Sequence, residues 1–140
     1  MADGRHARAL IDTSVVVDLD QIDAGRLPDA LAISALTLAE LAAGPHAAID
    51  ASERARRQET LQRVEATFDL VPFDADAARA FGRLYPAVAA VGRKARGRRA
   101  VDLMIAATAL AEELPLYTRN PGDFAGLEDL LEVAGVEVTG

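Results

Sequence analysis

The sequence contains four acidic residues whose carboxylate oxygens could together bind a cation. Asp12 interrupts the apolar stretch RALIDTSVVVDLD (residues 8–20), directly after four residues that have the pattern of a buried strand. A carboxylate at the edge of a hydrophobic core is costly unless something pairs with it. Asp12 therefore predicts either a helix cap or a bound ion. Three further acids share this ambiguity: Glu40, Asp102 and Asp123.

The elements that must position these acids are short apolar runs that alternate with helical patterns. The runs have strand length and are separated by longer segments rich in Ala, Leu, Glu and Arg. This alternation predicts one α/β domain over residues 1–140, with a mainly parallel central sheet. The expected strands cover residues 8–11, 31–34, 70–73, 115–118 and 136–138.

Five helical segments are expected between these strands. Asp74 is a favoured N-cap residue at the start of the fourth segment, and Pro86 is expected to bend or break that helix. The fifth segment is the most apolar and should pack in the core. The segments cover residues 14–21, 37–46, 52–68, 74–92 and 100–114.

The order of the elements brings three of the acids to one edge of the sheet. Asp12 follows the first expected strand directly, Glu40 lies early in the helix after the second, and Asp123 follows the fourth. In open parallel sheets, ligands bind outside the carboxyl ends of the strands. Asp102, at the start of the fifth helical segment, joins the other three if that helix packs beside them.

Helix capping is the structural alternative for the first two acids. Asp12 is a favoured N-cap for a helix that begins near Ser14. The segment TLAE matches a capping box, with Thr37 as the cap and Glu40 reaching back to the Thr37 amide. Either acid is explained by its local helix if it is considered alone.

The other two acids also have local explanations. Asp102 is expected where a helix dipole favours negative charge, and Asp123 could cap a short helix containing FAGLEDLL. Four converging acids would nevertheless repel one another, and a hard cation such as Mg²⁺ or Mn²⁺ relieves that repulsion. Polar groups suited to order waters or ligands around such an ion belong to Thr13, Ser14, Thr118 and Asn120.

Composition narrows the chemistry further. The 140 residues include no cysteine and two histidines, which excludes disulfides, thiolate zinc sites and thiol nucleophiles. A net charge of -7 would repel nucleic acid, so RNA binding would need a local basic patch or a bound metal. The sequence shows neither a membrane span nor a signal peptide, which predicts a cytoplasmic protein without a membrane partner.

Four segments together resemble the signatures of PIN-domain ribonucleases, and most closely those of VapC-type toxins from bacterial toxin–antitoxin pairs. They are spread over residues 9–127, in the order and approximate spacing of that family. The segments are LIDTSVVV with Asp12, SALTLAELAAG with Glu40, RAVDLMIAATAL with Asp102, and LPLYTRNPGDFAGL with Asp123.

The resemblance implies a three-layer α/β/α sandwich and metal-dependent endonucleolytic cleavage of RNA. The four acids would hold one or two Mg²⁺ ions, or Mn²⁺, and a metal-activated water would attack the scissile phosphorus. Some relatives place a polar ligand at the position of Asn120, so the fourth ligand is either Asp123 or Asn120. The resemblance also implies a homodimer and a cognate antitoxin that inhibits the toxin.

A basic run precedes Asp102 and offers a route for attracting RNA. The segment GRKARGRR (residues 92–99) contains two glycines typical of a flexible loop, and its arginines could guide phosphates toward the acids. A solvated loop explains the run equally well. The candidate RNA-binding residues are Arg93, Lys94, Arg96, Arg98 and Arg99.

Three rival functions are weighed against this interpretation. A haloacid dehalogenase phosphatase needs a second acid two residues after Asp12, where Ser14 stands, and a suitable lysine, whereas Lys94 is the only lysine. A receiver domain is also disfavoured, because it needs an aspartate after the third strand together with a late lysine, and the sequence does not supply this pair. The alternative that stays open is a PIN-like module that binds RNA or an antitoxin without cleavage.

Overall fold

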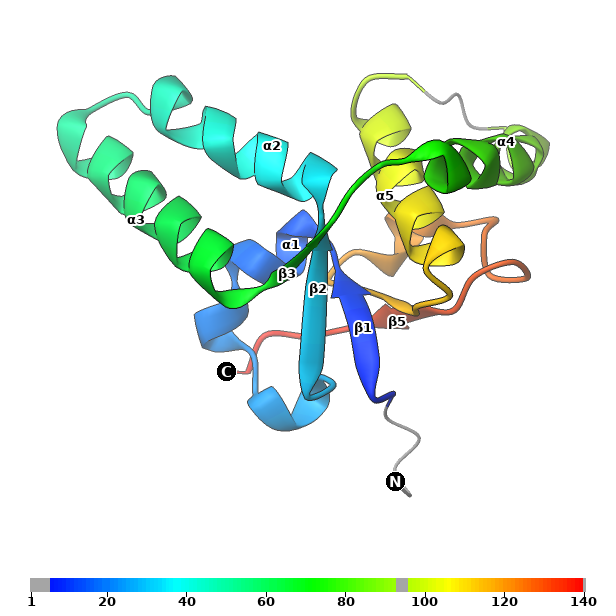
Figure 1. The fold of residues 1–140 in the computed structure, drawn as a ribbon, viewed down its shortest axis with the longest axis horizontal. Coiled ribbons are helices and arrows are strands. Elements are labelled where there is room, and N and C mark those ends of the chain that lie inside the picture. The colour runs from blue at the N-terminus through cyan, green and yellow to red at the C-terminus, as the bar shows by residue number, and fades with distance from the viewer. Residues whose placement is uncertain (1–5, 93–95, 140) are drawn as a thin grey trace.

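The computed structural model describes residues 6–92 and 96–139, and these contain a five-stranded sheet (Figure 1). The strand order is β3-β2-β1-β4-β5, and every neighbouring pair is parallel. The parallel sheet predicted from the sequence is therefore confirmed. The strands are β1 (Arg8–Ile11), β2 (Ala30–Ser34), β3 (Asp69–Val71), β4 (Leu116–Thr118) and β5 (Val133–Gly135).

Crossover connections join successive strands, as a parallel sheet requires. Those before β4 contain α-helices, and the β4–β5 connection contains only a 3-10 turn. None of the helices in the described part of the chain is long and apolar enough to cross a membrane. The α-helices are α1 (Thr13–Val17), α2 (Ala35–Ala43), α3 (Ala51–Thr67), α4 (Ala75–Ala90) and α5 (Arg98–Ala111). Short 3-10 turns lie at η1 (Leu19–Gln21), η2 (Ala24–Arg26), η3 (Gly44–Ala47) and η4 (Pro121–Phe124).

Alternating strand residues build a separate hydrophobic core on each face of the sheet. Leu10 and Ala32 pack with residues of α4 and α5, whereas Ala9 and Ile33 pack with residues of α1 and α3. Successive strand side chains point to opposite faces, so both faces are apolar and both need helical cover. Figure 1 shows α4 and α5 together on one side and the α2–α3 hairpin on the other. The predicted α/β/α layering is thereby confirmed.

Helix α4 runs without interruption through Pro86, so the proline does not break this helix, and the bend expected as the alternative stays a prediction. Pro86 removes one backbone donor, but Leu84 and Val88 on either side of it are buried against the core. Burial of this apolar face compensates for the missing hydrogen bond. The predicted cap is confirmed, because the Asp74 carboxylate accepts a hydrogen bond from the Ala77 amide at 3.0 Å.

The last strand lies nearer the N-terminus than the sequence predicts. β5 comprises Val133–Gly135, not the expected residues 136–138. Its pairing with β4 decides this register, with Leu116 opposite Val133 and Thr118 opposite Gly135. The apolar residues around 136 gave no local signal for choosing between the two positions.

Helix α2 is capped by Ser34, not by Thr37. The buried Ser34 hydroxyl accepts a hydrogen bond from the Thr37 amide at 3.1 Å, and α2 begins at Ala35. The capping box predicted for TLAE is therefore wrong. Glu40 lies within the helix and is free of the role that the capping box assigned to it.

Replacing Ser34 by alanine should destabilise the protein, because the buried Thr37 amide loses its acceptor. We expect Ser34→Ala to lower the free energy of unfolding by about 1–2 kcal/mol, measured by urea denaturation. Ser52→Ala is the matched control, since Ser52 is an exposed residue of α3. Equal effects of the two substitutions would contradict the capping role of Ser34.

Candidate active site

Asp12 is held in place as a helix cap and retains one oxygen for another ligand. Its Oδ1 accepts hydrogen bonds from the Val15 amide at 3.2 Å and from the Ser14 hydroxyl at 2.6 Å. The residue is only 6% exposed. From residues 6–92 and 96–139, Oδ2 accepts no hydrogen bond. The predicted capping role is confirmed, and it leaves Asp12 capable of a second one.

Glu40 is brought to the end of β1 by a hydroxyl from α1. The Thr13 hydroxyl donates a hydrogen bond to Oε1 of Glu40 at 2.6 Å and also lies 3.1 Å from the Thr37 hydroxyl. Thr13 is adjacent to Asp12, so this contact links the carboxyl ends of β1 and β2. The topology predicted this proximity, because both segments follow neighbouring parallel strands.

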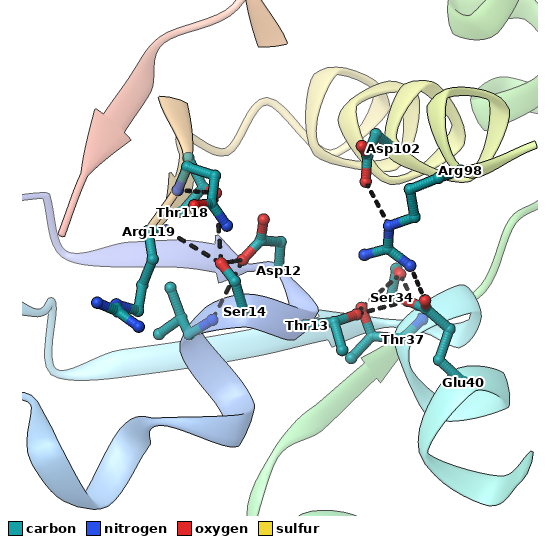
Figure 2. Close-up of polar contacts among 12 residues, drawn as sticks. Asp12, Thr13, Ser14, Ser34, Thr37, Glu40, Arg98, Asp102, Thr118 and Arg119 are labelled. Carbon is teal, nitrogen blue, oxygen red and sulfur yellow. Dashed lines mark hydrogen bonds and ion pairs between the residues drawn. The ribbon is translucent and has the colours of Figure 1, made fainter. Parts of the chain in front are cut away.

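Asp102 is buried on α5 and faces an arginine of the same helix. It is only 5% exposed, and its Oδ1 lies 3.4 Å from Nε of Arg98. Nη1 of Arg98 also bonds Oε2 of Glu40, so Figure 2 shows the guanidinium lying between the two acids. Asp102 follows the first turn of α5 and caps nothing, which makes the expected location at the helix start wrong.

The four predicted acids share one electrostatic environment. Burial raises the pKa of Asp102 to about 6, although the charge of Arg98 acts in the opposite direction. The negative charges of Asp123, Asp12 and Glu40 raise this pKa further, so all three lie within electrostatic reach of Asp102. Such accumulation of negative charge around a buried carboxyl is typical of functional sites.

The fourth acid lies in an exposed turn after β4. Asp123 belongs to η4, and no helix follows it over FAGLEDLL, so the predicted capping role is wrong. The hydroxyl of buried Thr118 accepts a hydrogen bond from the Asn120 amide at 3.0 Å and lies 3.4 Å from the Ser14 hydroxyl. Thr118 therefore fixes the turn that carries Asn120 and Asp123 against the start of α1.

Comparison with known proteins identifies the family of the chain. The model of the PIN domain family matches residues 9–129, which include all four acids. The chain belongs to the PIN domain family. The family resemblance noted in the sequence is thus confirmed.

The relatives of this PIN domain include VapC proteins. The chain is 38% identical over 135 residues to ribonuclease VapC5 of Mycobacterium tuberculosis, a match that covers 94% of this chain and 96% of that protein. The crystal structure of VapBC-5 from the same organism matches with 40% identity and a TM-score of 0.80, covering 95% of this chain and 100% of that one. VapBC-1 of nontypeable Haemophilus influenzae is 23% identical with a TM-score of 0.73, covering 91% and 97%, and supports the fold alone.

The basic run of this PIN domain is partly helical. Arg98 and Arg99 form the first turn of α5, so the loop expected over these two residues is wrong. Arg96 is exposed just before the helix, and Arg99 lines a small pocket together with Asp123. The candidate RNA-binding residues Arg93 and Lys94 lie outside the described residues.

The contact of Arg98 with two acids is the feature that sequence reasoning missed. The run suggested a cation for RNA, whereas the structure turns Arg98 toward Glu40 and Asp102. A usable signal was present, because residues four apart share one helix face and Arg98 precedes Asp102 by four. This signal could not be used from the sequence alone, because the fifth helical segment was expected to begin at residue 100 and α5 begins at Arg98.

The donor chemistry of this PIN domain fits a hard divalent cation. Asp12, Glu40 and Asp102 offer carboxylate oxygens, and the hydroxyls of Thr13 and Ser14 lie beside them. As these side chains stand, however, no group of three or more acids or histidines within the described ranges could hold a metal ion. Binding by three of these acids together would therefore need side-chain rearrangement, whereas one or two carboxylates with waters can suffice for Mg²⁺.

Proposed function

We propose that this PIN domain is a Mg²⁺-dependent endoribonuclease and the toxin of a type II toxin–antitoxin system, with Mn²⁺ as an alternative ion. The observation that carries the proposal is the arrangement of three acids: Thr13, next to buried Asp12, bonds Glu40, and Arg98 joins Glu40 to buried Asp102. The pKa of Asp102, which is raised by its burial and also by the charges of Asp123, Asp12 and Glu40, is consistent with this arrangement. Four acids in one place favour a divalent cation as their partner. The similarity to ribonuclease VapC5 supports RNA as the substrate class.

The residues of the site would have different roles in binding the cation. Asp12 and Asp102 would bind the cation through buried carboxylates, with Glu40 held ready by Thr13 and the fourth ligand supplied by Asp123 or Asn120. When bound, a divalent cation makes a coordinated water more acidic and offsets the charge that develops on the phosphate. Ser14 would hold the Asp12 carboxylate in position, and Thr118 would hold the turn that carries Asn120.

The surroundings of the site would supply RNA binding and regulation. Arg96 and Arg99, with Arg93 and Lys94 of the same run, would attract phosphates against the overall charge of -7. Matching toxin–antitoxin complexes support a cognate antitoxin as the partner. We further propose a homodimer that acts on RNA in the cytoplasm.

The test is incubation of the purified, antitoxin-free protein with total RNA and Mg²⁺ or Mn²⁺. We expect the wild type to degrade RNA, and Asp12→Asn and Asp102→Asn to leave it intact. If all three proteins leave RNA equally intact, the nuclease proposal fails. Tight RNA binding by all three without turnover would then favour the non-catalytic PIN-like module.

A further inference from the structure

We propose that Arg98 is an internal counter-ion of the active site that competes with the divalent cation for Glu40 and Asp102. The inference rests on the proposed function, because it takes these acids to be cation ligands. It assigns Arg98 a positioning role: the guanidinium keeps the two carboxylates oriented, and it must leave them for a cation to bind.

The contacts of Arg98 place one positive group between acids of two different helices. Nε lies 3.4 Å from Oδ1 of Asp102 on α5, and Nη1 bonds Oε2 of Glu40 on α2 (Figure 2). A guanidinium carries five donors in a rigid plane, so it can serve two carboxylates at once. Arg98 thus occupies the space in which a shared cation would have to sit.

The location of Arg98 is unfavourable unless these acids hold it there. It is the first residue of α5, where the helix dipole disfavours positive charge. Other arginine pairs, such as Arg79 with Asp76 and Arg57 with Glu53, stay within one helix and involve carboxylates more exposed than that of Asp102. The Asp102 carboxylate is buried, so its attraction to a cation is less screened by water.

Arg98 can leave without breaking the hydrogen bonds that hold Glu40 and Asp12. Its side chain is 56% exposed, so rotation about its flexible stem would carry the guanidinium into solvent. Glu40 would keep the hydrogen bond from Thr13, and Asp12 would keep those from Ser14 and Val15. Glu40 and Asp12 therefore stay in place when Arg98 leaves, and the affinity for a cation is reduced by the population in which Arg98 is bound.

The inference is tested by titrating Mn²⁺ into folded protein and measuring affinity by calorimetry. We expect Arg98→Met to bind Mn²⁺ about tenfold more tightly than the wild type, since no cation has to be displaced. Arg98→Lys keeps the positive charge but can bridge the two carboxylates less well, so its Mn²⁺ affinity should lie between those of the wild type and Arg98→Met. Arg79→Met removes an exposed arginine from an ion pair on α4 and should leave the Mn²⁺ affinity unchanged.

A second readout is thermal unfolding. In EDTA, Arg98→Met should melt at a lower temperature than the wild type, because Glu40 and Asp102 lose their counter-ion. Saturating Mn²⁺ should raise its melting temperature by more than that of the wild type. If Arg98→Met does not fold, Arg98→Gln is measured in the same way.

The outcomes separate this inference from the proposed function. Unchanged or weaker Mn²⁺ binding by the folded Arg98 variants would overturn the counter-ion role. If Asp12→Asn still abolished binding in that case, the proposed metal site would stand. Absence of Mn²⁺ binding to the wild type, or binding unaffected by Asp12→Asn and Asp102→Asn, would overturn both.

Discussion

Asp12→Asn is expected to reduce metal-dependent RNA cleavage by about 1,000-fold or more while preserving the fold. The amide keeps an oxygen that can accept the hydrogen bonds now made by Ser14 and Val15 to Oδ1. What it loses is the negative charge at the buried end of β1, where the proposed cation needs a carboxylate. The measurement is the single-turnover cleavage rate, with circular dichroism as the check on folding.

Asp74→Asn is the matched control for this experiment. Asp74 caps α4 through the Ala77 amide at 3.0 Å, as Asp12 caps α1 through Val15, but it follows β3 and caps a different helix. We expect the two variants to have similar stability and only Asp12→Asn to lose cleavage. If Asp12→Asn unfolds and its folded fraction still cleaves, Asp12 is a cap alone.

Asp102→Asn is expected to abolish cleavage to a similar degree and yet to stabilise the protein in EDTA. Burial raises the pKa of Asp102 from 3.8 to about 6 despite the nearby Arg98. The folded protein therefore holds this proton more tightly than the unfolded chain, and the stability linked to it is lost as pH rises between these two values. Above about pH 6 the neutral asparagine avoids that loss, which amounts to about 1–3 kcal/mol.

The measurement is urea denaturation of wild type and Asp102→Asn across pH in EDTA. The two should differ little near pH 3.8 and diverge as pH rises through about 6, with the variant more stable. Asp76→Asn changes an exposed carboxylate on α4 and should stay within about 0.5 kcal/mol of the wild type. A less stable Asp102→Asn above pH 6 would show that the pairing with Arg98 outweighs the burial of the charge.

The position of Asp12 was predictable because its signal is local. Three apolar residues of β1, Ala9, Leu10 and Ile11, lead directly into an acid, and both the strand and the cap follow from that short segment. The parallel order of strands was equally predictable from the alternation of runs. The edge at which Glu40 meets Asp12 then followed from topology.

Local signals failed where two residues could play the same part. Ser34 and Thr37 are both hydroxyl residues suited to cap α2, and the choice depends on where β2 ends, at Ser34. The register of β5 likewise depends on its pairing with β4 and not on its own few apolar residues. The continuity of α4 through Pro86 could not be predicted from the segment itself, because the burial of α4 is a tertiary effect.

The role of Arg98 needed the packing of two helices. The sequence shows an arginine in a basic run, but only the approach of α2 to α5 turns it toward Glu40 and Asp102. Long-range contacts of this kind decide whether a charge serves the substrate or the site itself.

The most direct test of the proposed chemistry is cleavage of a defined single-stranded RNA, with Mn²⁺ or with EDTA, followed by identification of the new ends. We predict cleavage only with the metal, and linear phosphate ends, because water attacks the phosphorus. Cleavage that persists in EDTA and leaves cyclic phosphate ends would show attack by the RNA's own hydroxyl group. That result, or intact RNA at every Mn²⁺ concentration, would contradict a metal-dependent hydrolytic site at Asp12, Glu40 and Asp102.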